Sequence, residues 1–191
     1  MKIIGITGSS GAGKDTVCAI LEEKYNAEIV DADKIAKELS KKGTMYLKSI
    51  VNCFGSGIID NKGELNRKKL ANIIFEDEAK REELNKLTFI HVVDEIKKRI
   101  NHLKKKIIVV NAPLLYESNL NQICDFVIAV IADRNKQINR VMKRDGITKE
   151  EAEKRLNAQN SNEFFTENAE YIIYNNEDIK NIEEQIAKIK I

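Results

Sequence analysis

A glycine-rich stretch near the start of the chain has the spacing of a phosphate-binding loop. Residues 8–14, with the sequence GSSGAGK, fit the pattern G-x-x-x-x-G-K. The glycines permit backbone angles at which successive N–H groups point at an anion, and Lys14 could reach the β- and γ-phosphates of a nucleotide. A short apolar run precedes the stretch and a helical pattern follows it, as this chemistry requires. A purely structural glycine-rich turn is the alternative.

The residue after Lys14 departs from the usual loop. That position normally holds a Ser or Thr whose hydroxyl binds Mg²⁺, and here it is Asp15, followed by Thr16. A carboxylate can bind a hard cation, but it also brings a negative charge close to the phosphates. Asp15 could instead stabilise the start of the helix through the helix dipole, leaving the ion to water and other carboxylates. Both roles stay open at this point.

Two carboxylates, Asp31 and Asp33, close the second apolar run of the chain. In a parallel sheet this strand end would lie next to the phosphate loop. One carboxylate can orient a hydroxyl and accept its proton, while the other helps to hold Mg²⁺ through water. The alternative is that Asp33 only caps a helix beginning at Lys34. We favour the phosphoryl-transfer role because of the expected position beside the loop.

Arginines with helical spacing follow the fourth apolar run. Arg140 and Arg144 are four residues apart and would share one helix face, with Arg155 and Gln159 further along. Guanidinium groups stabilise the charge that develops on a transferring phosphoryl group. Because several lysines lie nearby, a solvated basic surface competes as the explanation for any one arginine. We favour phosphate binding for the cluster.

The elements that must position these residues alternate between strands and helices. Five short apolar runs predict buried strands at residues 3–7, 28–30, 107–110, 126–131 and 171–174. Apolar residues at helical spacing separate these runs. One long helical stretch, at about 78–103, carries its expected apolar face at Phe89, Val93, Ile96, Ile100 and Leu103. The alternation indicates a three-layer α/β fold with a parallel sheet. Ligands bind such sheets at the carboxyl ends of the strands.

Length, charge and cysteine content argue against several other classes of protein. The chain has 191 residues, which fit one domain better than two, and 32 basic against 30 acidic residues give a net charge of +2. This balance gives no support for a nucleic-acid partner or a membrane partner. No apolar run approaches the roughly 20 residues of a membrane span, and the first residues do not form a signal peptide. Three widely spaced cysteines argue against disulfides and against a zinc site.

Two missing motifs narrow the kind of nucleotide-binding protein. The guanine-reading sequence N-K-x-D is lacking, since the nearest approach is NKGE at 61–64. The third expected strand ends in Asn111 rather than in the Asp of a Walker B motif. Both absences weaken the interpretation as a switch or a motor.

Taken together, these elements resemble the dephospho-coenzyme A kinase family, nearly from end to end. The segments DADKIA at 31–36 and PLLYE at 113–117 are more specific for it than the phosphate loop. Other segments that match are 54–55, 63–67, 70–75, the run from Gln137 through Arg144 to Gln159, and 169–176.

The resemblance implies a P-loop kinase core of five parallel strands in the order 2-3-1-4-5, flanked by helices. It implies a single kinase domain over residues 1–191, with its core at about 1–33, 106–133 and 166–191. Helices at about 34–105 would bind the acceptor, and residues at about 134–165 would form a lid. We expect a cytoplasmic monomer and leave an oligomer open.

The implied reaction transfers a phosphoryl group from ATP, with Mg²⁺, to the ribose 3′-hydroxyl of dephospho-coenzyme A. Its products are ADP and coenzyme A, in the last step of coenzyme A biosynthesis. The same resemblance makes Lys14, Asp33 and Arg140 catalytic, with Asp33 as the base or orienter of the hydroxyl. The residues implied in ATP binding are Gly8, Gly11, Ala12, Gly13, Lys14, Asp15, Thr16, Arg140, Arg144 and Asn175. The residues implied in metal binding are Asp15, Thr16 and Asp31.

Three positions depart from the family's pattern. Asp15 replaces a Ser or Thr, the His-Pro of the acceptor helix falls at Phe89-Ile90, and an acid near Glu163 replaces a basic residue of the lid. Neither His91 nor His102 is expected to be catalytic.

Two other functions stay open. A nucleoside monophosphate kinase of the same fold would phosphorylate a phosphate and would need a more basic acceptor pocket. A nucleotide-binding regulatory module would bind ATP without releasing ADP, and Asp15 would then mark lost activity. The segments at 31–36 and 113–117 argue against the first, and Lys14, Asp33 and Arg140 argue against the second.

Overall fold

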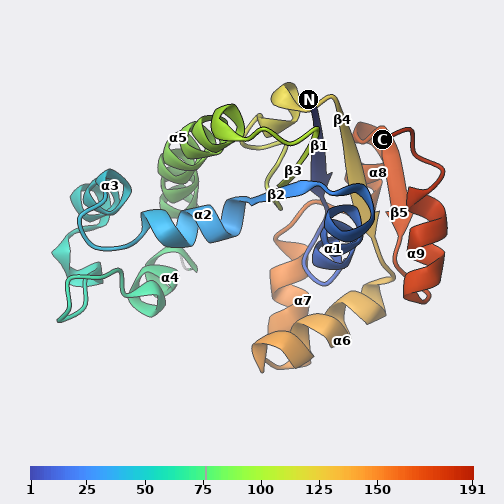
Figure 1. Cartoon of the computed structure of the whole chain (residues 1–191). Coiled ribbons are helices and arrows are strands. Elements are labelled where there is room, and N and C mark those ends of the chain that lie inside the picture. The colour runs from blue at the N-terminus through green and yellow to red at the C-terminus, as the bar shows by residue number, and fades with distance from the viewer. Residues whose placement is uncertain (76) are drawn as a thin grey trace. The chain divides into compact units, whose positions relative to one another are not determined.

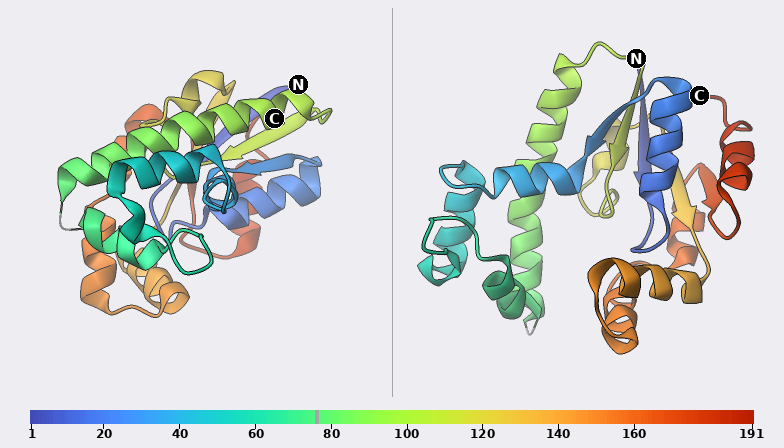
Figure 2. Two further views of the ribbon diagram at one scale, coloured as in Figure 1. Left: turned by 90° about the vertical axis from the view of Figure 1, so that its left-hand side faces the viewer. Right: turned by 60° about the horizontal axis from the view of Figure 1, so that its bottom comes forward.

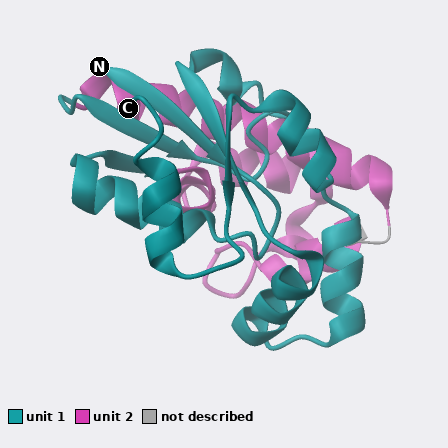
Figure 3. Ribbon diagram, turned by 90° about the vertical axis from the view of Figure 1, so that its right-hand side faces the viewer, with its two compact units in different colours: residues 1–30, 104–191 teal, residues 31–103 magenta. Residues whose placement is uncertain are grey.

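The computed structural model describes residues 1–75 and 77–191, which form two compact units. One unit comprises residues 1–30 and 104–191, and the other comprises residues 31–103, as Figure 3 shows in two colours. The first unit carries the phosphate loop and nearly all of a five-stranded sheet, and the second is helical.

The sheet has the strand order β2-β3-β1-β4-β5, with β1 paired in parallel to both β3 and β4 (Figure 1). Its strands are β1 (Lys2–Thr7), β2 (Glu28–Asp31), β3 (Ile107–Asn111), β4 (Phe126–Ile131) and β5 (Tyr171–Tyr174). The predicted strands and their order are therefore confirmed.

Both faces of the sheet are covered, which explains the continuous apolar runs. Ile128 and Val130 of β4 belong to a core that also contains residues of α1 (Lys14–Tyr25) and α9 (Ile179–Ile186). Successive side chains of a strand point to opposite faces, so Ala129 and Ile131 pack into a different cluster, with Phe165 of α8 (Asn162–Asn168). Since each face meets a core, no position in the strand can be polar without cost.

Two helices after β4 form a pair with a small core of their own. They are α6 (Arg134–Asp145) and α7 (Lys149–Asn157). The buried residues between them are Ile138, Val141, Ala152 and Leu156. Gly146 ends α6 in the left-handed region at φ 65°, and Thr148 with Glu151 forms a capping box that starts α7. The pair thereby fixes the turn between the arginine-bearing segments.

The second unit is built around α5, the long helix coloured green in Figure 2. Its elements are α2 (Ala32–Leu39), α3 (Met45–Phe54), the 3₁₀ helix η1 (Ser56–Ile58), α4 (Arg67–Phe75) and α5 (Glu78–His102). The first unit contains another 3₁₀ helix, η2 (Leu120–Ile123). Helices α2, α3 and α4 each pack against α5. The predicted apolar face of α5 is confirmed at Ile96 and Ile100, which are buried, while Phe89 and Val93 are half-buried and Val92 is buried beside them. Several helices surround α5, so its apolar surface is broader than one stripe. Even so, in the described part of the chain no helix is both long and apolar enough to cross a membrane.

The three cysteines lie in enclosed or partly enclosed surroundings. Cys18 is buried, and Cys53 and Cys124 are partly buried. Burial raises the pKa of Cys124 to about 12, with a further contribution from the nearby Asp125 carboxylate. Burial, together with Glu83, raises the pKa of Cys53 to about 11. Both thiols are therefore protonated at neutral pH.

Candidate active site

The loop between β1 and α1 has a backbone that requires glycine. Gly8, Gly11 and Gly13 have φ values of 136°, 74° and 100°. A Cβ on Gly8 would lie 2.3 Å from the carbonyl oxygen of Val130, and one on Gly11 would lie 2.6 Å from that of Gln137. The loop therefore runs directly against β4 and α6, and it leads into the positive end of the α1 dipole, which favours an anion.

Lys14 begins α1 and folds back over the loop. Its Nζ donates to the carbonyl oxygens of Gly8 at 2.8 Å and Ser9 at 3.4 Å. The ammonium group is thus held against the same backbone whose N–H groups would bind a phosphate.

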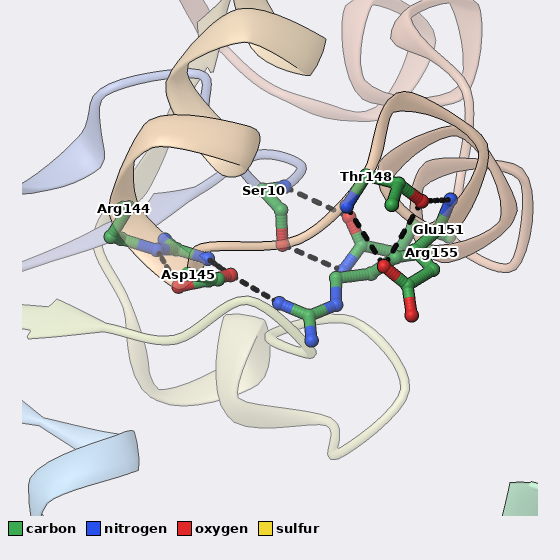
Figure 4. Close-up of polar contacts among 7 residues, drawn as sticks. Ser10, Arg144, Asp145, Thr148, Glu151 and Arg155 are labelled. Carbon is green, nitrogen blue, oxygen red and sulfur yellow. Dashed lines mark hydrogen bonds and ion pairs between the residues drawn. The ribbon is translucent and has the colours of Figure 1, made fainter.

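Two glutamines from the chain after β4, one in α6 and one just after α7, hold the first half of the loop. Nε2 of Gln137, which is 2% exposed, donates to Oγ of Ser9 at 2.8 Å. Gln159 accepts from the backbone N–H of Ser10 at 2.8 Å and donates to its Oγ at 3.1 Å, and Figure 4 marks both bonds at Ser10. The segment that follows α7 is therefore bonded to the phosphate loop at two atoms of one residue.

Arg140 and Asn175 meet at the second half of the loop. The Arg140 guanidinium donates to the carbonyl oxygens of Gly11 at 3.1 Å and Ala12 at 3.4 Å, while Asn175 Nδ2 donates to Ala12 at 2.8 Å. A Cβ on Gly13 would lie only 1.9 Å from Asn175 Nδ2. The structure thus brings both predicted residues to the loop, where Arg140 is bonded to backbone carbonyls.

Arg144 and Arg155, the other two arginines of the predicted cluster, both pair with one carboxylate. Asp145 accepts from Nε and Nη2 of Arg144 at 2.7 and 2.8 Å, and it also pairs with Arg155 (Figure 4). The Arg144 guanidinium, followed by Arg155, holds the pKa of Asp145 below its usual range. These ion pairs join the end of α6 to α7, because Arg144 and Arg155 both contact the carboxylate of Asp145.

Asp15 lies in the first turn of α1, as the dipole argument requires, and it also contacts β3. Asn111 Nδ2 donates to Oδ1 of Asp15 at 3.3 Å. Thr16 follows in the same turn, so a carboxylate and a hydroxyl lie beside the loop. Among the described residues, no three His, Cys, Asp or Glu side chains form a metal-binding group. A cation here would fit the Mg²⁺ pattern of one or two protein oxygens, substrate phosphates and water.

Asp31 and Asp33 belong to the helical unit. Oδ1 of Asp31 accepts from the backbone N–H of Lys34 at 2.8 Å and caps α2, which begins at Ala32. The alternative that Asp33 is the cap is therefore wrong, since Asp33 lies inside the first turn. Asp33 is therefore an acidic residue of the first turn of α2, inside the cap that Asp31 supplies.

The PLLYE segment joins the end of β3 to the loop region. The carbonyl oxygen of Pro113 accepts from Thr7 Oγ1 at 3.4 Å, and Glu117 accepts from Asn160 Nδ2 at 2.8 Å. The Tyr116 ring meets that of Phe164 edge-on at 5.6 Å. These contacts connect the segment to β1 and to the start of α8.

Three of the residues in these contacts had no predicted role at the loop. Gln137 and Gln159 match the family pattern, but no local signal assigns them to the loop. Asn111 is expected at the ligand-binding edge of the sheet, but no role is predicted for its side chain. A polar residue at the end of an apolar strand is the one sign that could have indicated Asn111.

A phosphate loop after the first strand of a 2-3-1-4-5 parallel sheet, with the basic helix α6 following β4, defines the class of P-loop kinases. The chain belongs to the dephospho-CoA kinase family, whose model matches residues 2–181.

Individual relatives agree with this assignment. The chain is 38% identical to the dephospho-CoA kinase of Fusobacterium nucleatum subsp. nucleatum over 186 residues, covering 97% of this chain and 95% of that protein. A crystal structure of TT1252 from Thermus thermophilus has a TM-score of 0.83 at 26% identity, with 98% and 94% coverage of the two chains. The dephospho-CoA kinase of Campylobacter jejuni has a TM-score of 0.69 at 26% identity, with 98% and 95% coverage.

Proposed function

We propose that this chain transfers the γ-phosphoryl group of ATP to the ribose 3′-hydroxyl of dephospho-CoA, which gives CoA and ADP in the last step of CoA biosynthesis. The observation that carries the proposal is the family match over residues 2–181, on a chain whose β1–α1 loop has phosphate-binding geometry. Because both substrates are small molecules in solution, we place the protein in the cytoplasm and expect it to act as a monomer.

The loop and its neighbours would hold ATP. The backbone from Gly8 to Thr16 and the ammonium of Lys14 would bind the β- and γ-phosphates. Arg140 and Asn175 support this role, because they fix the second half of the loop by hydrogen bonds to its carbonyls. Arg144 would add positive charge from α6 after exchanging its bonds to Asp145 for a phosphate.

Asp33 would orient the acceptor hydroxyl and accept its proton. This role is supported by its place in the segment DADKIA and by the finding that Asp31, not Asp33, caps α2. Asp15 and Thr16, with Asp31 through water, would hold Mg²⁺, which when bound neutralises phosphate charge.

Two helical regions would handle the acceptor and exclude water. We assign acceptor binding to residues 34–105 and a lid function to residues 134–165, within the single domain of 1–191. Exclusion of water matters because an exposed γ-phosphate would be hydrolysed without an acceptor.

The test is ADP release from Mg·ATP with and without dephospho-CoA, beside a panel of nucleoside monophosphates, with CoA identified by mass spectrometry. We expect ADP only with dephospho-CoA, and very little release in its absence. Lys14→Ala should abolish turnover, whereas Lys24→Ala, on the exposed end of the same helix, should not. Release driven by a monophosphate would identify a nucleotide kinase instead, and ATP binding with no release would identify a regulatory module.

A further inference from the structure

The loop and the end of β3 carry an unusual pair of side chains. In P-loop proteins Mg²⁺ is commonly held by a hydroxyl on the loop together with a carboxylate from a Walker B Asp. In this chain the loop carries a carboxylate, Asp15, and β3 ends in an amide, Asn111. The carboxylate thus stands on the loop instead of on the strand, and a neutral amide takes its place at the end of β3.

The two side chains touch, although 96 residues separate them. Asn111 Nδ2 donates to Asp15 Oδ1 at 3.3 Å. Asn111 is 5% exposed and pairs in register with Ile6 of β1, which places it on the rigid centre of the sheet. Asp15 is exposed in the first turn of α1. The buried amide therefore fixes one oxygen of the exposed carboxylate.

We propose that Asp15 and Asn111 form an exchanged cation-binding pair, in which Asp15 supplies the anionic oxygen for the metal of Mg·ATP and Asn111 positions it. The inference rests on the proposed function only in taking Mg·ATP as the ligand. An amide suits the strand position because a second carboxylate at this distance would repel the first unless one of them took up a proton.

A metal-ligand role for Asp15 and a helix-dipole role for Asp15 predict different effects of changing residue 111. Charge at a helix N-terminus stabilises the helix whatever its neighbour. A positioned ligand depends on its neighbour, and loss of a positioning group typically weakens metal affinity by about 10- to 100-fold. Coupling between residues 15 and 111 therefore separates the two roles.

The experiment is a double-mutant cycle read by binding of Mn²⁺ in the presence of a non-hydrolysable ATP analogue, with free Mn²⁺ measured by electron paramagnetic resonance. The variants are Asp15→Ser, Asn111→Asp and the double variant, which restores the common hydroxyl-and-carboxylate arrangement. Asn111→Ala tests positioning alone, and Glu22→Gln, an exposed carboxylate further along α1, is the matched control. Thermal melting without metal verifies that each variant folds.

We expect Asn111→Ala to weaken Mn²⁺ affinity by roughly tenfold, and Asp15→Ser to weaken it at least as much. Asn111→Asp should melt at a lower temperature than the wild type without metal, since two carboxylates then face each other. The double variant should recover most of the affinity that Asp15→Ser loses, and Glu22→Gln should bind as the wild type does.

The proposal would be overturned if Asp15→Ser bound Mn²⁺ with wild-type affinity. It would also be overturned if the double variant bound Mn²⁺ no more tightly than Asp15→Ser does. If Asn111→Asp fails to fold, Asp15→Ser and the double variant still decide the matter. Dephospho-CoA is absent from this assay. A positive cycle in a protein that does not phosphorylate dephospho-CoA would therefore refute the proposed acceptor and leave the pair standing.

Discussion

The side chain of Arg140 donates to both oxygens of Asn175, at 3.1 Å to the backbone carbonyl and 3.2 Å to Oδ1. Asn175 in turn donates to Ala12 in the phosphate loop. The end of β5, helix α6 and the loop are thus joined through two side chains, so the shape of the nucleotide site depends on residues that need not touch the nucleotide.

Arg140→Lys should weaken ATP binding by about tenfold or more, because a single ammonium cannot replace the four guanidinium bonds that hold the loop and Asn175. The free energy of unfolding should fall by about 1–3 kcal/mol, the usual size for charged hydrogen bonds. Calorimetric titration with ATP and thermal melting measure the two effects. Lys143→Ala, on the exposed side of α6, is the control. Unchanged ATP affinity with a reduced kcat would instead show direct action on the transferring group.

Asp33→Asn should reduce kcat by about 100-fold or more while leaving ATP affinity within a small factor, because the amide cannot accept the proton of the acceptor hydroxyl. Steady-state kinetics with both substrates varied, together with ATP titration, provide the measurement. Asp178→Ala, which removes the side-chain cap of α9, is the comparison, and its effect should be a loss of about 1 kcal/mol in stability without loss of kcat. Equal losses of turnover and ATP affinity in Asp33→Asn would mean that Asp33 is structural.

Asp145→Asn should remove a pH-dependent part of the stability. The arginines lower the folded-state pKa of Asp145 below that of an unpaired aspartate, so the paired carboxylate stabilises the fold above the pKa of the unfolded chain. This contribution disappears as the pH falls through the folded-state pKa. Urea unfolding at pH 7 and at pH 3 should show a difference of about 1 kcal/mol at neutral pH that shrinks in acid. Glu150→Gln on α7 is the control, and a constant difference at both pH values would contradict the argument.

Gln159→Met should increase ATP hydrolysis without acceptor relative to acceptor-dependent turnover. The variant keeps the size of the side chain but loses both bonds to Ser10, so the segment after α7 no longer holds the first half of the loop. ADP release with and without dephospho-CoA measures the ratio, with Gln122→Met on the surface of η2 as the control. If the ratio of acceptor-free to acceptor-dependent ADP release did not change, the two bonds between Gln159 and Ser10 would not help to exclude water.

The strands and the loop were predictable because their signals are local. A run such as 126–131 has an unbroken apolar character that a two-sided core imposes, and the glycines of the loop are required by their own φ angles. The partners of the loop were not predictable in this way. Asn111 contacts Asp15 across 96 residues of sequence, and Gln159 contacts Ser10 across 149. Such contacts form only once the whole fold has assembled. Similarly, the choice of Asp31 over Asp33 as a cap depends on where the backbone turns into α2.

The protonated cysteines have a consequence for the chemistry of the proposed product. CoA carries a thiol, and thiol–disulfide exchange with its oxidised forms requires a thiolate on the protein. With pKa values of about 12 for Cys124 and about 11 for Cys53, almost none of either side chain is ionised at neutral pH. Cys53 and Cys124 are thereby protected from forming mixed disulfides with CoA, and both should stay free of such adducts even when the CoA pool is partly oxidised.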